Sequence, residues 1–542
     1  MKWPLMPEKD RWLLAIDLGN GGPKVAAVAP DGHIMGTALR GVSVQIGKDG
    51  AATQDAGEWI EALVSAVAEL LDSGDIQPEA LHAIGITGQW GSTVPVGSHG
   101  EPVGPVLLWA DTRAERYAAK VVGGPISVSG YAPQKIVPWI RATGGAPSPL
   151  GSDPTGHSLL LQNDLADIGR QAHVLLEPVD YLAFRLTGKV AASPASMVLS
   201  WITDNRIDSP PRYVPQLVRK AQRQPALLPP LVPTGTIQGP LLPDVAADLG
   251  VPAGVPVVSG IPDFHAAAIG SGAVGPYETH LAISTTAWIS APVPFKKTDL
   301  LHQIASVPGL TPDHHLVINN VDTAGAALKW LREQIIAPHD GLLGGGSGIG
   351  ADGAADEQMS PSFDALTSLA ASVPPGSEGV IFAPWLAGER SPVEDKHIRA
   401  TWLNLTLRTD RAALIRSVME GVAYNVRWLF DYYAKFIGEP VHRIRLLGGG
   451  AQSDLWAQIL AGVLDRPMER VADPRNAQLR GVALWARVCL GEMTLDEAAA
   501  LVPVDKTFFP HETDRDEYQR LYGEYRRLYP TVKGLYKRLN PR

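Results

Sequence analysis

The chain has 542 residues, of which 45% are hydrophobic and 19% are charged, proportions typical of a globular protein with a large buried core. Its formal net charge is −9 and no Lys/Arg run stands out, which argues against nucleic acid or an anionic membrane surface as the partner. The only cysteine, Cys489, excludes an intrachain disulfide and a thiolate metal cluster, and it fits a reducing compartment. The first residues lack a signal-peptide core and no apolar run reaches membrane-spanning length, so we expect a cytoplasmic protein.

The chain opens with a pattern typical of antiparallel strands. Apolar runs at 12–16 and 24–29 predict two strands, and the short Gly-rich segment between them predicts a tight hairpin turn. Because this turn leads into a strand and not into a helix, the spacing excludes both a P-loop and a dinucleotide-binding fingerprint. A formal Gly-x-Gly-x-x-Gly match at 348–353 has no strand before it, and its Gly-rich surroundings predict a flexible surface insertion.

Strand-like runs alternate with helical patterns along the rest of the chain, which predicts an α/β protein. Helical periodicity is clear at 57–72 and 411–435. Tyrosines and a leucine recur at helical spacing in 516–529, which predicts a docked amphipathic helix and not a cofactor-binding stripe. A Pro-rich stretch marks the domain boundary, so we expect a first domain over 1–255 and a second over 256–542.

One aspartate stands at a position suited to chemistry. In the segment VVSGIPDFHAAAIGSGAV, Asp263 lies between the end of a strand and a short Ala-rich helix that Gly270 or Gly272 would close. The spacing predicts that Asp263 is the N-cap of this helix, where the helix dipole would keep its carboxylate ionised. The sharper interpretation is a general base or metal ligand at the mouth of a cleft, and the two roles are compatible.

Two hairpin turns are suited to binding an anion. Asp17 is followed by the turn Gly19–Gly22 and by Lys24, so backbone N–H groups and one ammonium group can approach a negatively charged ligand closely. A second predicted hairpin has the small polar turn 284–286 and weakly repeats the pattern of the first. Two related halves with such turns would suit a nucleotide held between them, and an ordinary tight hairpin is the alternative.

A third turn joins a predicted strand to a predicted helix. Strand residues 444–447 run into the glycines 448–450, and Ser453 is expected to cap a helix that begins at Asp454. A flat ring can lie against the side-chain-free backbone of such a turn. Close packing of the helix on the strand is the alternative interpretation.

Taken in chain order, these segments resemble the FGGY carbohydrate kinases, which are sugar and polyol kinases of the actin/hexokinase-like superfamily. The resemblance covers nearly the whole chain. Within the family, the motifs resemble those of the xylulose kinases most. The segments that carry it are DLGNGGPK, GITGQWGSTVPV, GPVLLWADTRA, EPVDYLAFRLTGK, SGIPDFHAAAIGSGAV, STTAW, FAPWLAGERSP and LLGGGAQSDLW. The resemblance implies two actin-like (ribonuclease-H-like) domains flanking a central cleft, and ATP-dependent phosphorylation of a small sugar, ketose or polyol.

The resemblance also implies roles for individual residues. Asp263 would be the general base for the sugar hydroxyl, and Asp17 and Asp263 would hold Mg²⁺. The residues implied in ATP binding are Gly19, Asn20, Gly21, Gly22, Lys24, Thr285, Thr286, Gly449, Gly450 and Ser453. Those implied in the sugar pocket are Gln89, Trp90, Trp109, Asp111 and Phe264. The expected ligands are therefore ATP, Mg²⁺ and a small sugar or polyol, and a homodimer is a candidate assembly.

Several positions depart from the family pattern. Asn20 and Gly21 stand where the family commonly has Thr and Ser or Thr, and Ser284 stands where glycine is usual. Phe264 replaces an asparagine of the xylulose kinases, and Trp90 begins a pair that replaces their Met-His pair. Aromatic rings offer stacking faces in place of hydrogen bonds, which disfavours xylulose as the substrate. The altered turns leave two alternatives, a nucleotide-driven switch without sugar turnover and a non-catalytic scaffold.

Overall fold

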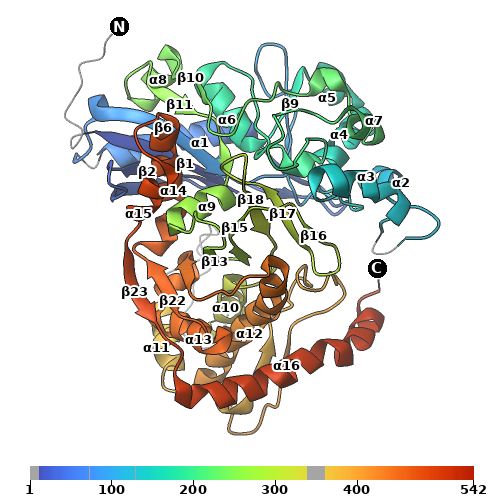
Figure 1. Ribbon diagram of the computed structural model, residues 1–542, viewed down its shortest axis with the longest axis vertical. Coiled ribbons are helices and arrows are strands. Elements are labelled where there is room, and N and C mark those ends of the chain that lie inside the picture. The colour runs from blue at the N-terminus through green and yellow to red at the C-terminus, as the bar shows by residue number, and fades with distance from the viewer. Residues whose placement is uncertain (1–10, 73, 128–129, 338–360, 542) are drawn as a thin grey trace, which may run out of the picture.

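The computed structural model describes residues 11–72, 74–127, 130–337 and 361–541, and it shows a mixed helix and sheet protein in two halves (Figure 1). The insertion expected at 348–353 lies outside these residues. Across the described ranges, no helix combines the length and apolar character that crossing a bilayer requires. The cytoplasmic location and the homodimer stay predictions.

The first half is built on a seven-stranded sheet, and its opening hairpin confirms the antiparallel start predicted for the chain. Its path runs β10 (Ile237–Pro240), β11 (Pro256–Val258), β6 (Leu81–Gly88), β1 (Trp12–Gly19), β2 (Gly22–Val28) and β3 (Ile34–Leu39), with β12 (Ile261–Pro262) also paired to β6. The boundary at residue 255 stays a prediction, although β11 and β12, which follow it, belong to this sheet.

Both faces of this sheet are covered, which explains why β1 and β6 are continuous apolar runs. In β1, Leu14 and Ile16 pack on the side of α1 (Ala56–Asp72), the helix predicted at 57–72. Leu13 and Ala15 pack on the opposite side with α14 (Ala477–Cys489), which comes from the far end of the chain. Because successive side chains point to opposite faces of the sheet, one strand contributes residues to two hydrophobic cores.

The second half is built on a five-stranded sheet with a related start. Its order is β14 (Ala287–Ser290), β13 (Thr279–Ile283), β21 (Ile444–Leu447), β22 (Met468–Val471) and β23 (Val504–Phe508). β13 pairs with β14 antiparallel and with β21 parallel, as β1 pairs with β2 and β6. The weak repeat seen in the sequence thus corresponds to the same three-strand arrangement in both halves.

Three helices contribute nearly half of the buried residues in the core of the second half. They are α12 (Arg411–Ile437), α13 (Asp454–Leu464) and α16 (Glu512–Leu539), and α12 matches the helix predicted at 411–435. α16 runs along the end of the molecule farthest from the first half (Figure 1). It buries Tyr518, Tyr522 and Tyr525 against this core, which confirms the docked helix predicted over 516–529.

Helices α9 (Asp263–Ser271) and α14 lie between the two halves (Figure 1). They approach so closely that a Cβ added to Gly270 would lie 1.8 Å from the carbonyl oxygen of Ala477, and one added to Gly481 would lie 2.0 Å from that of Ala266. α14 is also fastened to the first half, because Arg480 donates from Nε to the carbonyl oxygen of Gly32 at 3.0 Å. A helix from the second half is thus seated on the first sheet.

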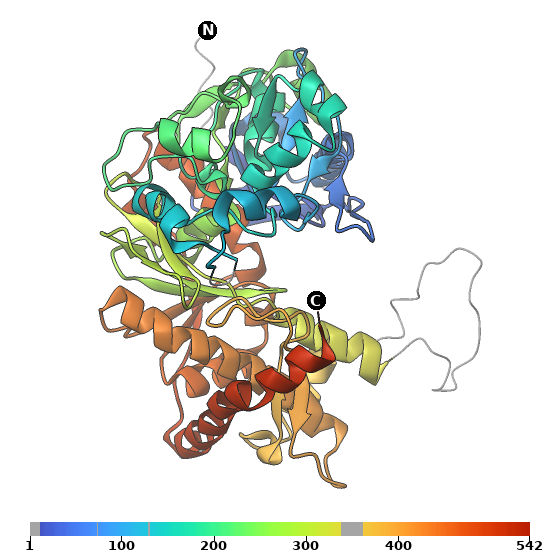
Figure 2. The ribbon, with the colours of Figure 1, turned by 90° about the vertical axis from the view of Figure 1, so that its right-hand side faces the viewer.

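A smaller antiparallel sheet also bridges the halves, and Figure 2 shows it between them. Its order is β15 (Pro292–Val293), β18 (His315–Ile318), β17 (Ile304–Pro308) and β16 (Thr298–Asp299). Lys296 and Thr298 donate to backbone carbonyls of Ile140 and Gly144, both at 2.6 Å. The remaining longer elements include α2 (Glu115–Val122), α3 (Pro133–Thr143), α4 (Pro154–Gln162), α6 (Pro178–Thr187), α8 (Pro243–Leu249), α10 (Gly325–Leu331), α11 (Phe363–Ala370) and α15 (Leu495–Ala500).

Candidate active site

Asp17 and Asp263 belong to segments that lie on the two sides of β6. Asp17 of β1 is in register with Thr87 of β6, and Thr87 is in register on its other side with Ile261 of β12, two residues before Asp263. Burial, reinforced by the charge of Asp17, raises the pKa of Asp263 to about 7. Burial also raises the pKa of Asp17 to about 6, and Lys24 opposes that shift. Both acids are half-buried, so they share a site that is partly shielded from solvent.

The predicted capping role of Asp263 is wrong. Pro262 is the N-cap residue of α9, with φ −58° and ψ 152°, and Asp263 is the first helical residue. Its Oδ1 accepts from the N–H of Phe264, one residue on, at 2.7 Å. Burial and the charge of Asp17 outweigh the backbone donor Phe264, so the pKa of Asp263 is raised and not lowered. The result is a carboxyl group poised to exchange a proton near neutrality.

Lys24 connects the first hairpin to the second half of the chain. It lies opposite Asp17 in the β1–β2 register, and its Nζ donates to the carbonyl oxygen of Arg475 at 3.3 Å. Burial lowers the pKa of Lys24 and Asp17 opposes that shift. Arg475 belongs to η9 (Pro474–Asn476), and the carbonyl oxygen of Pro474 accepts from Gly448 at 2.8 Å. The first turn and the Gly-rich turn after β21 are thus joined through one short segment.

The second hairpin turn and the Gly-rich turn lie at the same edge of the second sheet. β13 and β21 are parallel neighbours, so the turn 284–286 after β13 lies beside Gly448 after β21. Gly448 has φ +94°, and a Cβ there would lie 2.4 Å from the carbonyl oxygen of Ile283, so the close approach requires glycine. Gly449 has open space around it, and Ser453 caps α13 as predicted.

Three aromatic rings link the loop that follows β6 to both halves. Trp90 follows β6 and is stacked on Phe264 of α9, with ring centroids 6.3 Å apart and planes at 23°. Phe264 in turn contacts Trp288 of β14 at 5.9 Å. Phe264 is only 5% exposed, whereas Trp90 is half-buried, so Trp90 is the more accessible member of the stack.

Trp109 and Asp111 have different surroundings although they are close in sequence. Trp109 is 39% exposed, and its Nε1 donates to Oδ1 of Asn20 in the first turn at 3.1 Å. Asp111 is buried, forms an ion pair with Arg113 at 2.6 Å and accepts from the N–H of Ala52 at 3.2 Å. Trp109 is therefore open to a ligand, and Asp111 anchors the loop that carries it.

Gln54, at the end of β5 (Ala52–Gln54), is a site residue that the sequence did not reveal. Its Nε2 donates to the carbonyl oxygen of Asn20 at 2.8 Å, and its Oε1 accepts from Gln89 at 3.3 Å and from Trp59 at 3.2 Å. Gln54 thus joins the first turn to the predicted sugar pocket. No local motif marks it, because its partners lie in other elements.

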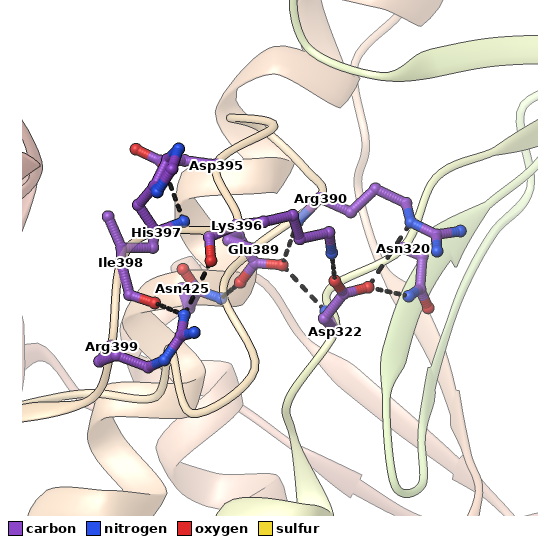
Figure 3. Close-up of polar contacts among 10 residues, drawn as sticks. All are labelled: Asn320, Asp322, Glu389, Arg390, Asp395, Lys396, His397, Ile398, Arg399 and Asn425. Atoms are coloured by element: carbon purple, nitrogen blue, oxygen red, sulfur yellow. Dashed lines mark hydrogen bonds and ion pairs between the residues drawn. The ribbon is translucent and has the colours of Figure 1, made fainter. Parts of the chain in front are cut away.

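A buried acid also supports the second turn, and sequence reasoning did not assign it a role. Glu389 accepts from the backbone N–H groups of Asp322 and Arg390, both at 2.9 Å (Figure 3). Burial, and then the charge of Asp322, raises the pKa of Glu389 to about 7. Asp322 itself is paired with Lys396 (Figure 3). The segment FAPWLAGERSP is thereby tied to the residues around 322.

The backbone just after Asp322 holds the turn 284–286 directly. The N–H groups of Ala324 and Gly325 donate to the carbonyl oxygens of Thr285 and Ser284, at 2.9 and 2.7 Å. Ser284 therefore contributes its backbone to a fixed turn, although it departs from the family's glycine. Glu389 is the buried anchor behind this turn.

Models of the FGGY family of carbohydrate kinases match most of the chain. The N-terminal domain of the family matches residues 12–128 and 157–270, and the C-terminal domain matches 278–490. The chain belongs to the FGGY family of carbohydrate kinases. As a family member it is an ATP-dependent kinase of a small sugar or polyol, and the expected enzyme class is confirmed.

Relatives of this FGGY kinase match it almost end to end. A xylulose kinase of Staphylococcus epidermidis is 25% identical, covering 96% of this chain and 97% of its own length. A gluconokinase of Bacillus subtilis is 23% identical, with 94% of each chain covered.

Solved structures confirm the expected pair of actin-like domains. A ligand-bound xylulose kinase of Lactobacillus acidophilus has a TM-score of 0.81 at 22% identity, covering 98% of this chain and 100% of that one. A glycerol kinase of Plasmodium falciparum with ADP has a TM-score of 0.77 at 17% identity, covering 95% and 97%.

Proposed function

We propose that this FGGY kinase transfers the γ-phosphate of ATP to a primary hydroxyl of a small ketose or polyol, with Asp263 as the general base. The observation that carries the proposal is the pairing of Asp263 with Asp17 in one site that is partly shielded from solvent. A carboxylate with a raised pKa is a stronger base, and the pKa of Asp263 is raised to about 7.

The proton and the phosphoryl group move in opposite directions. Asp263 takes the proton of the sugar hydroxyl, and the oxygen forms a bond to the γ-phosphorus while the bond to the β-γ bridging oxygen breaks. ADP then carries away the electron pair of the broken bond. Lys24 lies beside Asp17, where its positive charge would stabilise charge on the transferring group.

The two carboxylates fit Mg²⁺ as the metal. Within the described residues, no group of three or more His, Cys, Asp or Glu side chains is placed to hold a metal on its own. Mg²⁺ usually takes one or two protein carboxylates and completes its shell with water and substrate phosphates, so Asp17 and Asp263 suffice. Bound there, Mg²⁺ would neutralise negative charge on the phosphates.

The remaining site residues divide between nucleotide and sugar. The turns 19–22 and 284–286 would bind the phosphates through backbone N–H groups, and the turn 448–450 with Ser453 would border adenine. The sugar would contact Trp90, Gln89 and Trp109 from the first half. Phe264 and Asp111 would act mainly by holding Trp90 and the Trp109 loop in place.

The proposal is tested by ADP release over a panel of ketoses, aldoses, aldonates and polyols that includes xylulose, gluconate and glycerol. We expect turnover that depends on one of these compounds, and a loss on the order of 10²–10⁴ in kcat for Asp263→Asn. Binding of a non-hydrolysable ATP analogue to that variant should persist. Asp410→Asn is the matched control, because Asp410 caps α12 away from the site and asparagine caps as well.

Two outcomes would contradict the proposal. ATP hydrolysis that no sugar stimulates would support the nucleotide-driven switch. Failure to bind the ATP analogue at all would support the scaffold.

A further inference from the structure

The first phosphate turn and the sugar pocket share a hydrogen bond between two side chains. Asn20, in the turn between β1 and β2, accepts at Oδ1 from the indole Nε1 of Trp109 at 3.1 Å. Both side chains are exposed, so this contact is accessible to ligands and does not build the core. One residue assigned to ATP and one assigned to the sugar are therefore in direct contact.

This hydrogen bond fixes the orientation of the Asn20 amide. An indole N–H can only donate, so the carbonyl arm of the amide must face Trp109. The NH₂ arm, which is the donor end, is then turned away from Trp109. An anion needs that donor end, because the carbonyl oxygen would repel it. In the family pattern a Thr stands at this position, and its hydroxyl rotates freely to donate.

A second connection holds the backbone of the same residue. Gln54 donates to the carbonyl oxygen of Asn20 at 2.8 Å and accepts from Gln89 at 3.3 Å. Gln89 is also fixed through its own N–H, which donates to the carbonyl oxygen of Leu18 in β1 at 2.8 Å. The main chain and the side chain of Asn20 are thus both set by residues of the sugar pocket.

We propose that Trp109 is a positioning residue for the nucleotide, which it orients through Asn20, so that the sugar pocket and the phosphate turn are energetically coupled. The sugar orders Trp109, Trp109 orders the Asn20 amide, and the amide donates to a phosphate oxygen. This inference rests on the proposed function for the identity of the two ligands. Its core test uses nucleotide binding alone and needs no turnover.

The test is a double-substitution cycle measured by calorimetry with a non-hydrolysable ATP analogue and Mg²⁺. Asn20→Ala and Trp109→Phe should each weaken binding about 5-fold, the worth of one hydrogen bond, and the double variant should again lose only about 5-fold. A loss of about 25-fold in the double variant, or no loss in either single variant, would overturn the inference.

Restoring the family residue gives a second, independent outcome. In Asn20→Thr the hydroxyl donates without help from an indole, so we expect tight binding that Trp109→Phe no longer weakens. Binding that stays sensitive to Trp109 in this background would contradict the proposal. Trp402→Phe is the matched control, because it removes an indole donor to Ser417 in the second half and should leave binding unchanged.

A kinetic readout separates positioning from a general structural defect. Trp109→Phe should raise the KM for ATP at a saturating sugar concentration more than it lowers kcat. A partly unfolded variant would instead show a lower apparent kcat with an unchanged KM. A chain that shows the coupling but phosphorylates no compound of the panel would refute the proposed function alone. A chain that phosphorylates a sugar but gives additive losses would refute this inference alone.

Discussion

At the scale of single residues, burial and neighbouring charges together set the pKa values of the site residues. Burial raises the pKa values of Asp17 and Asp263 and lowers that of Lys24. The electrostatic attraction between Asp17 and Lys24 opposes the pKa shift of each of these two groups. Each group therefore depends on its neighbour for its charge state. Removing one of them changes the chemistry of the others.

Substitution of Lys24 tests this balance. Lys24→Met should weaken binding of the ATP analogue about 10- to 100-fold, because a charged donor to the phosphates is lost. It should also raise the pKa of Asp17 further, since Lys24 opposes that rise. Calorimetry of the variant against Lys24→Arg, which keeps the charge, measures the effect. Equal affinities for Lys24→Met and the unaltered chain would exclude Lys24 from the nucleotide site.

Which residues the sequence could reveal depends on how far their contacts reach. Asp17, Lys24 and Asp263 stand in short motifs whose residue types and spacing are typical of a phosphate site, and the structure brings Asp17 close to both of the others. Gln54 acts through partners in distant segments, so no local pattern marks it. Glu389 lies in the segment FAPWLAGERSP, but its contact with the N–H of Asp322 joins distant parts of the chain and could not be predicted from that segment. The capping error at Asp263 arose because Pro262 takes the cap position itself.

At the scale of elements, the pair α9 and α14 positions Asp263, the proposed general base. The helices touch through Gly270 and Gly481, where any side chain would overlap the backbone of the other helix. Asp263 begins α9, so the packing of this pair sets its place. The sequence predicted the short helix and its closing glycine, but not its partner, since α14 begins more than two hundred residues later.

Alanine at Gly270 should therefore harm both stability and catalysis. The added methyl would lie 1.8 Å from the carbonyl oxygen of Ala477, so we expect a loss of at least about 2 kcal/mol in the free energy of unfolding. A shift of α9 by about 1 Å would also lower kcat by up to about 100-fold. Thermal unfolding and the ADP-release assay measure the two effects.

Gly523 provides the matched control in another helix. It lies in α16 with no atom within 4 Å of an added Cβ, so Gly523→Ala should stabilise the protein by about 0.5–1 kcal/mol. If Gly270→Ala were equally harmless, the close approach of α9 and α14 would not hold Asp263 in place.

At the scale of the whole molecule, the fold carries a titratable group that opposes folding in acid. His280 of β13 is fully buried, and within the described residues neither ring nitrogen has a hydrogen-bond partner. Burial lowers its pKa from 6.5 to about 3. Below pH 6.5 His280 is protonated in the unfolded chain but stays neutral in the folded chain. The free energy of unfolding therefore falls as the pH falls.

The free energy of unfolding should therefore drop by about 1.4 kcal/mol per pH unit on account of His280 between about pH 6 and pH 4. His280→Leu removes this dependence, so its stability relative to the unaltered chain should rise steadily as the pH is lowered. Thermal unfolding at a series of pH values measures the difference, with the exposed His442→Leu as the control. A difference that does not change with pH would show that His280 takes up its proton in the folded state.

The seating of α14 on the first sheet has a consequence for how such kinases can be recombined (Figure 1). A chimaera assembled from two distant parents, joined anywhere between α9 and α14, would combine two helices that were not selected to pack against each other. Their backbones interlock without side chains to adjust, so a mismatch cannot be absorbed by repacking. Recombination that preserves this contact should therefore take α9 and α14 from the same parent.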